Sequence, residues 1–225
     1  MRWLSVENVA FTLLGYSMSW IELLGTTTYL WSVWLMARRR MLTWPIGIVS
    51  VLLYLALFWQ IRLYSDAVEQ IYYLAASAYG WYRWARGAVE SPLASTIRVS
   101  PARTLGVEIA LVAGGTLALG YAMSRAHLTA PTLFPEPASF PYLDAGTTVA
   151  SFVAMALLAL KRLESWVWWI GVDVIGIGLY WVKDVRFVAL LYAVLLVLAV
   201  RGLVEWERAR HVGSDRTLAP KLHNT

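Results

Sequence analysis

The sequence predicts an all-α integral membrane protein with seven transmembrane helices. Of its 225 residues, 59% are hydrophobic and only 15% are charged. That balance is typical neither of a soluble globular domain nor of a disordered chain. In addition, seven apolar segments come close to the roughly 20 residues that a helix needs to cross the hydrocarbon core of a bilayer.

These segments define the expected domains. We place the helices at about 19–37, 44–61, 64–85, 104–123, 143–160, 165–182 and 186–206. Residues 19–85 form a first three-helix bundle, 104–123 a linker helix and 143–206 a second three-helix bundle. Residues 1–18 have no signal-peptide cleavage pattern and are expected to form an interfacial amphipathic helix. Residues 207–225 are expected to form a cytoplasmic tail.

Lysine and arginine predict the orientation of these helices. Fourteen of the 19 basic residues fall at the C-terminal end or in the loops between helices one and two, three and four, and five and six. Only five fall on the other side. Because basic loops stay in the cytoplasm, the N-terminus is predicted outside and the C-terminus inside, in a multi-pass protein of the cell (inner) membrane.

The composition also excludes several functions. There is no cysteine, and the three histidines lie in loops and in the tail, so neither a disulfide framework nor a metal site is expected. The net charge of +5 is accounted for by the cytoplasmic edges of the helices, so nucleic-acid binding is not expected. One acid at the middle of a helix, without buried His or Cys, is too little for a membrane-embedded enzyme, and no cofactor is expected.

An internal repeat appears at a constant offset of 122 residues. Eight chemically similar pairs fall at structural landmarks without a gap: Glu22/Asp144, Thr26/Thr148, Arg39/Lys161, Arg40/Arg162, Trp44/Trp166, Phe58/Tyr180, Gly80/Gly202 and Trp84/Trp206. Each copy contains three helices, so two copies joined directly would face opposite ways. Helix 104–123 acts as an inversion linker, which predicts the parallel 3+1+3 arrangement of SWEET-type transporters.

The candidate site lies on the axis between the two bundles. Trp166, Trp169, Asp173 and Tyr180 share one face of the sixth helix. A carboxylate at bilayer depth costs at least about 2.5–3.5 kcal/mol, so Asp173 should face a partner or a wet cavity. An aromatic wall with one acid suits a flat organic cation. The alternative is that Asp173 only bonds a neighbouring helix.

Two stretches resemble the signature regions of the PnuC family of bacterial vitamin transporters. The similar motifs are W-P-x-G at Trp44 to Gly47, L-Y-x-D-x-x-x-Q at Leu63 to Gln70, Y-G-W-x-x-W at Tyr79 to Trp84, and W-x-x-W-I-x-x-D/N-V at Trp166 to Val174. The resemblance covers most of residues 20–208. It implies a 3+1+3 fold, a homotrimer, and uptake of nicotinamide riboside by facilitated diffusion, with phosphorylation by a cytoplasmic kinase trapping the solute.

The resemblance also implies a substrate pocket. Carried over to this sequence, it consists of Trp44, Gln70, Trp166, Trp169 and Asp173, with Tyr54 and Tyr180 as wall residues. Glu69 departs from the apolar residue expected before the glutamine and brings a second acid near the pocket. Thiamine, another aromatic cation, is therefore the alternative solute, and riboflavin is a further one, because the fold does not determine the cargo.

Overall fold

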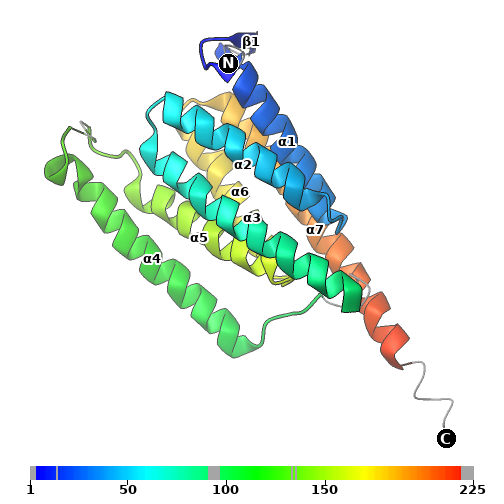
Figure 1. Cartoon of the computed structure of the whole chain (residues 1–225). Helices are drawn as coiled ribbons and strands as arrows, with labels where there is room; N and C mark the ends of the chain where they lie inside the picture. The colour runs from blue at the N-terminus through cyan, green and yellow to red at the C-terminus, as the bar shows by residue number, and fades with distance from the viewer. Residues whose placement is uncertain (1–3, 14, 91–96, 133, 135, 219–225) are drawn as a thin grey trace, which may run out of the picture.

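The computed structural model describes residues 4–13, 15–90, 97–132, 134 and 136–218. These residues form seven helices and one short β-hairpin (Figure 1). The helices are α1 Trp20–Ala37, α2 Thr43–Gln60, α3 Tyr64–Glu90, α4 Ala102–Thr129, α5 Pro141–Ala159, α6 Ser165–Val182 and α7 Arg186–Leu218. Five of them (α2, α4, α5, α6 and α7) are long and apolar enough to cross a membrane.

The predicted N-terminal helix is wrong. Strand β1, Val9–Leu13, pairs antiparallel with β2, Tyr16–Ser19, and Gly15 in the turn between them has φ 80°. A glycine adopts this left-handed conformation without the steric cost that a Cβ imposes. The strands contain Val, Phe, Thr and Tyr, which suit a strand better than a helix. Their apolar residues are therefore not one face of a helix.

The other predicted helices are present, with ends that shift by a few residues. The largest differences are at α4 and α7, which continue six and twelve residues beyond the predicted ends 123 and 206. The predicted ends are the points where the apolar run stops. A helix needs no lipid to continue, however, and polar residues such as Glu and Arg favour it. Part of the predicted tail is therefore helical, while residues 219–225 lie outside the described residues.

The helices pack as two groups of three with α4 on the outside. Within the first group α2 contacts both α1 and α3, and within the second α6 contacts both α5 and α7. The groups meet along two seams, α1 with α7 and α3 with α5. Helix α4 lies beside α5, at the edge of the molecule (Figure 1). Each helix pair in contact in the first group has a corresponding pair in the second, at the 122-residue offset: α1 and α2 correspond to α5 and α6, and α2 and α3 to α6 and α7.

The residues with positive φ that follow four of the helices are related by the same offset. We call these positions the backbone corners. Arg39 and Lys161, which follow α1 and α5, both have φ 57°. Arg62 and Asp184, which follow α2 and α6, have φ 61° and 57°. Non-glycine residues with positive φ are uncommon. The described residues contain these four alone, and they form two pairs separated by 122 residues.

Four buried tryptophans form the core where α2 and α6 begin. Trp44 meets Trp84 edge to face, with ring centroids 5.3 Å apart, and Trp166 meets Trp206 in the same way at 5.6 Å. Trp84 and Trp206 then join the two groups at 5.9 Å. The Trp206 indole also donates a hydrogen bond to the Met36 carbonyl oxygen at 3.1 Å. We call this end of the bundle the tryptophan end, and the opposite one the hairpin end.

Two glycines make room for the tryptophans. A Cβ on Gly80 would lie 2.2 Å from the Trp44 ring, and a Cβ on Gly202 would lie 2.6 Å from the Trp166 ring. Both rings are about 1% exposed and have no room to move aside. In both helix groups, the shape of the indole ring therefore fits the space that the glycine leaves.

We predict that Gly80→Ala and Gly202→Ala each lower the melting temperature of the purified protein. Overpacking a filled core costs about 1–3 kcal/mol. The matched control is Gly171→Ala in α6, where an added Cβ meets nothing within 4 Å. A control that destabilises as much as the other two would show that the tryptophan contacts are not the cause.

Candidate substrate-binding site

A cavity of about 680 Å³ lies between the two helix groups. It extends from the β-hairpin to Trp44 and Trp166 at the tryptophan end. Along α6 it reaches from Trp166 to Tyr180, which is about 21 Å at 1.5 Å of rise per residue. All seven residues predicted from the sequence line it: Trp44, Tyr54, Gln70, Trp166, Trp169, Asp173 and Tyr180.

The predicted tryptophans occupy two different environments. Trp44 and Trp166 are about 1% exposed and belong to the tryptophan core, so they form the floor of the cavity. Trp169 lies one helical turn further in and is only partly buried. Of the three, Trp169 offers the most ring surface to a solute.

Asp173 lies halfway along the α6 wall, seven residues from both Trp166 and Tyr180. Its side chain lines the cavity, and the residue is 3% exposed. Among the described residues it has no hydrogen-bond or ion-pair partner. A buried charge without a partner is costly. The carboxylate thus lacks the interhelical bond that a purely structural role requires.

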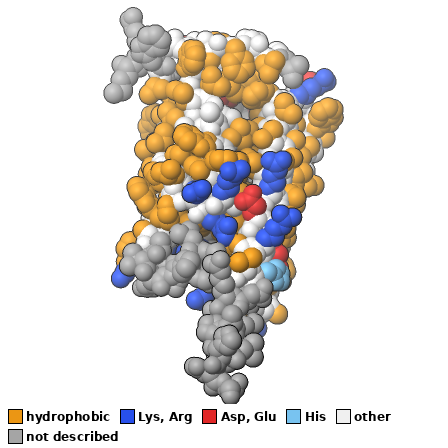
Figure 2. Space-filling model, turned by 90° about the vertical axis from the view of Figure 1, so that its right-hand side faces the viewer, with side chains coloured by type: hydrophobic (Ala, Val, Ile, Leu, Met, Phe, Trp, Pro, Cys, Tyr) orange, Lys and Arg blue, Asp and Glu red, His pale blue; other side chains and the backbone are white. Residues whose placement is uncertain are grey.

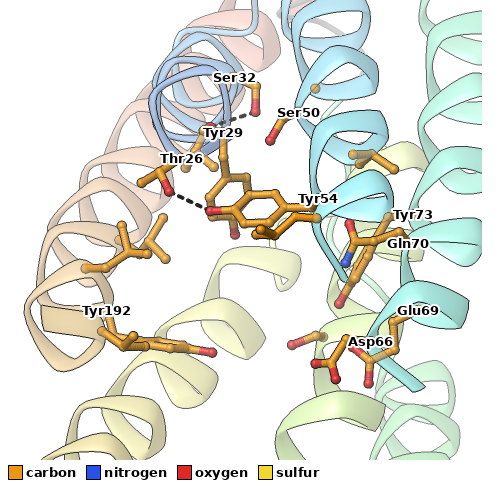
Figure 3. A pocket seen from close by; sticks show the side chains of 18 of the residues that line it. Thr26, Tyr29, Ser32, Ser50, Tyr54, Asp66, Glu69, Gln70, Tyr73 and Tyr192 are labelled. Carbon is orange, nitrogen blue, oxygen red and sulfur yellow. Dashed lines mark hydrogen bonds between the residues drawn. The ribbon is translucent and has the colours of Figure 1, made fainter. Parts of the chain in front are cut away.

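The remaining wall comes from α1, α2, α3, α5 and α7. Figure 3 shows Gln70 and Tyr73 of α3 directed into the space on one side and Tyr192 of α7 on the other. The Tyr192 ring stacks on Tyr180, with centroids 5.4 Å apart. The Tyr54 hydroxyl is hydrogen-bonded to Thr26 of α1 at 2.7 Å. These contacts hold the aromatic rings in place before any solute arrives.

The charged residues along the cavity are all acidic. Glu22, Asp66 and Glu69 line its part near the hairpin end, and Asp173 lies deeper. Thr148 of α5 donates a hydrogen bond to Glu69 at 3.0 Å. Among the described residues that line the cavity there is no Lys, Arg or His. The cavity is therefore electrostatically suited to cations.

The β-hairpin covers the cavity at its end. The Tyr16 ring stacks on Phe187 of α7 at 5.2 Å, and its hydroxyl donates to Glu22 of α1. Burial, followed by this hydrogen bond, raises the pKa of Tyr16 well above its usual value. Gln60 of α2 bonds the Val6 amide and the Leu4 carbonyl oxygen at 3.2 and 3.0 Å. The N-terminal segment thus contacts both helix groups.

Comparison with known proteins identifies the family. Residues 19–208 match the family described as nicotinamide mononucleotide transporter. The nicotinamide riboside transporter PnuC of Escherichia coli is 30% identical over 97% of this chain and 100% of its own length. The riboflavin/roseoflavin transporter RibM of Streptomyces davaonensis is 28% identical over 92% of each chain.

This chain belongs to the nicotinamide mononucleotide transporter family. The crystal structure of the vitamin B3 transporter PnuC has the same fold, with a TM-score of 0.65 at 21% identity over 86% of this chain and 83% of that one. The protein is accordingly a multi-pass membrane protein of a transporter family, as the sequence predicted.

Helix α1 also lines the cavity, which the sequence analysis did not predict. Glu22, Thr26, Tyr29 and Ser32 all line it. They recur at intervals of four, three and three residues, which places them on one helix face. That polar stripe in an apolar helix was the signal that could have revealed them. Tyr192 was also missed, although it is the single tyrosine of its helix.

Helix α4 contains one buried acid, Glu108. This residue is 4% exposed and accepts a hydrogen bond from the Trp168 indole at 3.2 Å. Trp168 precedes the cavity residue Trp169. The hydrogen bond of Glu108 therefore connects α4 to α6, the helix that carries Asp173. The two bonded residues are 60 positions apart in the sequence.

The two environments of the tryptophans predict different mutant phenotypes. Trp166→Ala removes a fully buried ring from the core and should destabilise the protein by about 3–5 kcal/mol. Trp169→Ala removes a partly buried ring that faces the cavity and should lower the melting temperature much less. Thermal unfolding of the two purified variants checks this. Equal losses of stability would place both rings in the core.

Proposed function

We propose that this protein takes up nicotinamide riboside by facilitated diffusion. The observation that carries the proposal is the cavity, whose charged lining residues are four carboxylates and whose walls are aromatic. Nicotinamide riboside has a flat, cationic ring, which can stack on indole and phenol rings and is attracted to a carboxylate. Its ribose hydroxyls offer hydrogen-bond partners to Gln70 and Asp173. The E. coli relative is named a nicotinamide riboside transporter.

The same lining argues against the mononucleotide that names the family. A phosphate monoester carries about −1.5 to −2 charges at neutral pH. Phosphate recognition uses Arg, Lys or helix N-termini, and the described lining residues include no basic side chain. An anion would meet Glu22, Asp66 and Glu69 before it reached the deeper part of the cavity.

Thiamine is the second candidate solute. It is also an aromatic cation, and Glu69 together with Asp173 provides two acids along one cavity. Riboflavin, the solute in the name of the S. davaonensis relative, has no positive charge for these acids to attract. It is therefore the weaker alternative.

In this proposal the solute occupies the middle of the cavity. Trp169 stacks on its ring, and Asp173 lies near its positive charge. Gln70 bonds the ribose, Tyr54 and Tyr180 form the wall towards the hairpin end, and Trp44 and Trp166 form the floor.

We further propose a 3+1+3 architecture with α4 as the inversion linker. The matched helix contacts, the paired corners with positive φ and the two tryptophan–glycine contacts support it. The hairpin end then faces outwards, and the tryptophan end, with most of the arginines, faces the cytoplasm. A reporter fused after Thr225 should be cytoplasmic, and a reporter inserted near Thr132 should be external. If both reporters lie on the same side of the membrane, this topology is excluded.

Trapping of the solute follows from the electrostatics of the cavity. Phosphorylation by a cytoplasmic kinase converts the cation into a species with net negative charge, which the acidic cavity no longer accepts. The carrier then needs no ion gradient. The resemblance to the family further suggests a homotrimer, and α4 has exposed apolar residues, among them Leu111 and Leu117, that are available to a second copy.

Uptake into vesicles that contain only the purified protein tests the function. Labelled nicotinamide riboside should enter saturably until its inner and outer concentrations are equal. Excess unlabelled riboside should compete, and the mononucleotide should not. Accumulation above equilibrium that an uncoupler abolishes would contradict facilitated diffusion. Uptake equal to that of protein-free vesicles would contradict the proposal as a whole.

Asp173→Asn provides the sharpest mutational prediction. The change keeps the shape and removes the charge, whose Coulomb energy with a cation at 4 Å is roughly 4 kcal/mol at an effective dielectric constant of 20, before desolvation. Nicotinamide riboside affinity should fall clearly, whereas its uncharged, ring-reduced analogue should lose much less. The two dissociation constants and the melting temperature measure this. Equal losses for both ligands, together with a lower melting temperature, would assign Asp173 a structural role.

A further inference from the structure

Five arginines gather where α1 and α7 meet at the tryptophan end. Arg38, Arg39 and Arg40 follow the last residue of α1, and Arg201 and Arg208 lie on α7. The hydrogen bond from Trp206 of α7 to the Met36 carbonyl oxygen of α1 brings the two helices together at this point. Figure 2 views this side of the molecule and shows basic side chains clustered below a broad hydrophobic area. We call these five residues the arginine patch.

The positive charges of the patch are not neutralised within the described part of the chain. None of the ion pairs found there includes an arginine of the patch. On the same helix Arg210 does form one, with Glu207 at 2.6 Å. Arg38, Arg40, Arg201 and Arg208 are exposed. Glu205 and Glu207 lie between Arg201 and Arg208, but Glu207 is paired with Arg210. The patch therefore keeps a net positive charge.

Apolar surface directly adjoins these charges. Val197, Arg201, Val204 and Arg208 recur at intervals of four, three and four residues and so share one face of α7. Val197 and Val204 are 53% and 41% exposed. On α1 the Arg38 guanidinium lies 4.2 Å from the centroid of the exposed Trp34 ring. Tryptophan rings of this kind are typical of the membrane interface.

We propose that the arginine patch binds the headgroup of an anionic phospholipid. The exposed valines lie where the acyl chains would pack, and the arginines lie where the phosphates would be. Guanidinium groups bind phosphate oxygens with two parallel hydrogen bonds. An acidic peptide would satisfy the charges and leave the valines exposed, whereas a phospholipid covers both. The site is separate from the transport cavity, because no arginine lines the described part of that cavity.

Counting bound lipids on the purified protein by native mass spectrometry tests this site. Phosphatidylglycerol and phosphatidylethanolamine with identical acyl chains are titrated in turn. The wild type should bind phosphatidylglycerol more tightly. Arg201→Gln/Arg208→Gln should weaken that binding by at least about tenfold, since each arginine near an anionic surface strengthens binding by about fivefold. Soluble glycerol 3-phosphate should not bind.

The matched control is Arg98→Gln/Arg103→Gln. It removes two exposed arginines from the same end of the molecule, neither of which belongs to the patch. It should change phosphatidylglycerol binding by less than twofold. Arg201→Lys/Arg208→Lys, which keeps the charge but loses the paired hydrogen bonds, should lose less binding than the glutamine variant and guards against a folding defect. Equal losses in the two glutamine variants, or a wild type without lipid preference, would overturn the proposal.

Discussion

The contact between a buried indole and a glycine is the constraint on which the rest of the structure depends. Trp44 lies against Gly80 and Trp166 against Gly202, and neither contact would fit with one more carbon atom on the glycine. Each contact holds the second helix of its group against the third. The rings also meet Trp84 and Trp206, so one cluster joins the two groups and closes the cavity at that end. Without the tryptophan cluster, the cavity that contains the four acidic residues would be open at the tryptophan end.

The two helix groups share these packing contacts, but the residues with which they line the cavity differ. At the 122-residue offset, Asp173 corresponds to Val51, Trp169 to Gly47 and Gln70 to Tyr192. The residues at the corners and in the core correspond between the halves, because both halves must pack in the same way. The residues that face the cavity differ, since a single solute that lacks twofold symmetry needs different partners on its two sides. This difference supports a cavity shaped for one bound molecule.

The sequence predicted those features that depend on local composition. Apolar length located all seven helices, and the similar pairs at a fixed offset marked the positions that correspond between the two groups. It failed where the outcome depends on contacts between distant residues. Gln60 of α2 bonds Leu4 and Val6 ahead of the hairpin. Phe187 of α7 stacks on Tyr16 of the hairpin, and Trp168 donates to Glu108. Tyr29 was not predicted, because the motifs that carry the family resemblance lie on α2, α3 and α6 and none lies on α1.

A structure determined with nicotinamide riboside bound would test the central claim most directly. We predict the solute in the middle of the cavity, with its ring against Trp169, its positive charge towards Asp173 and the tryptophan floor closed beneath it. A solute bound outside the cavity, or one within it whose charged ring faces away from Asp173, would contradict this account.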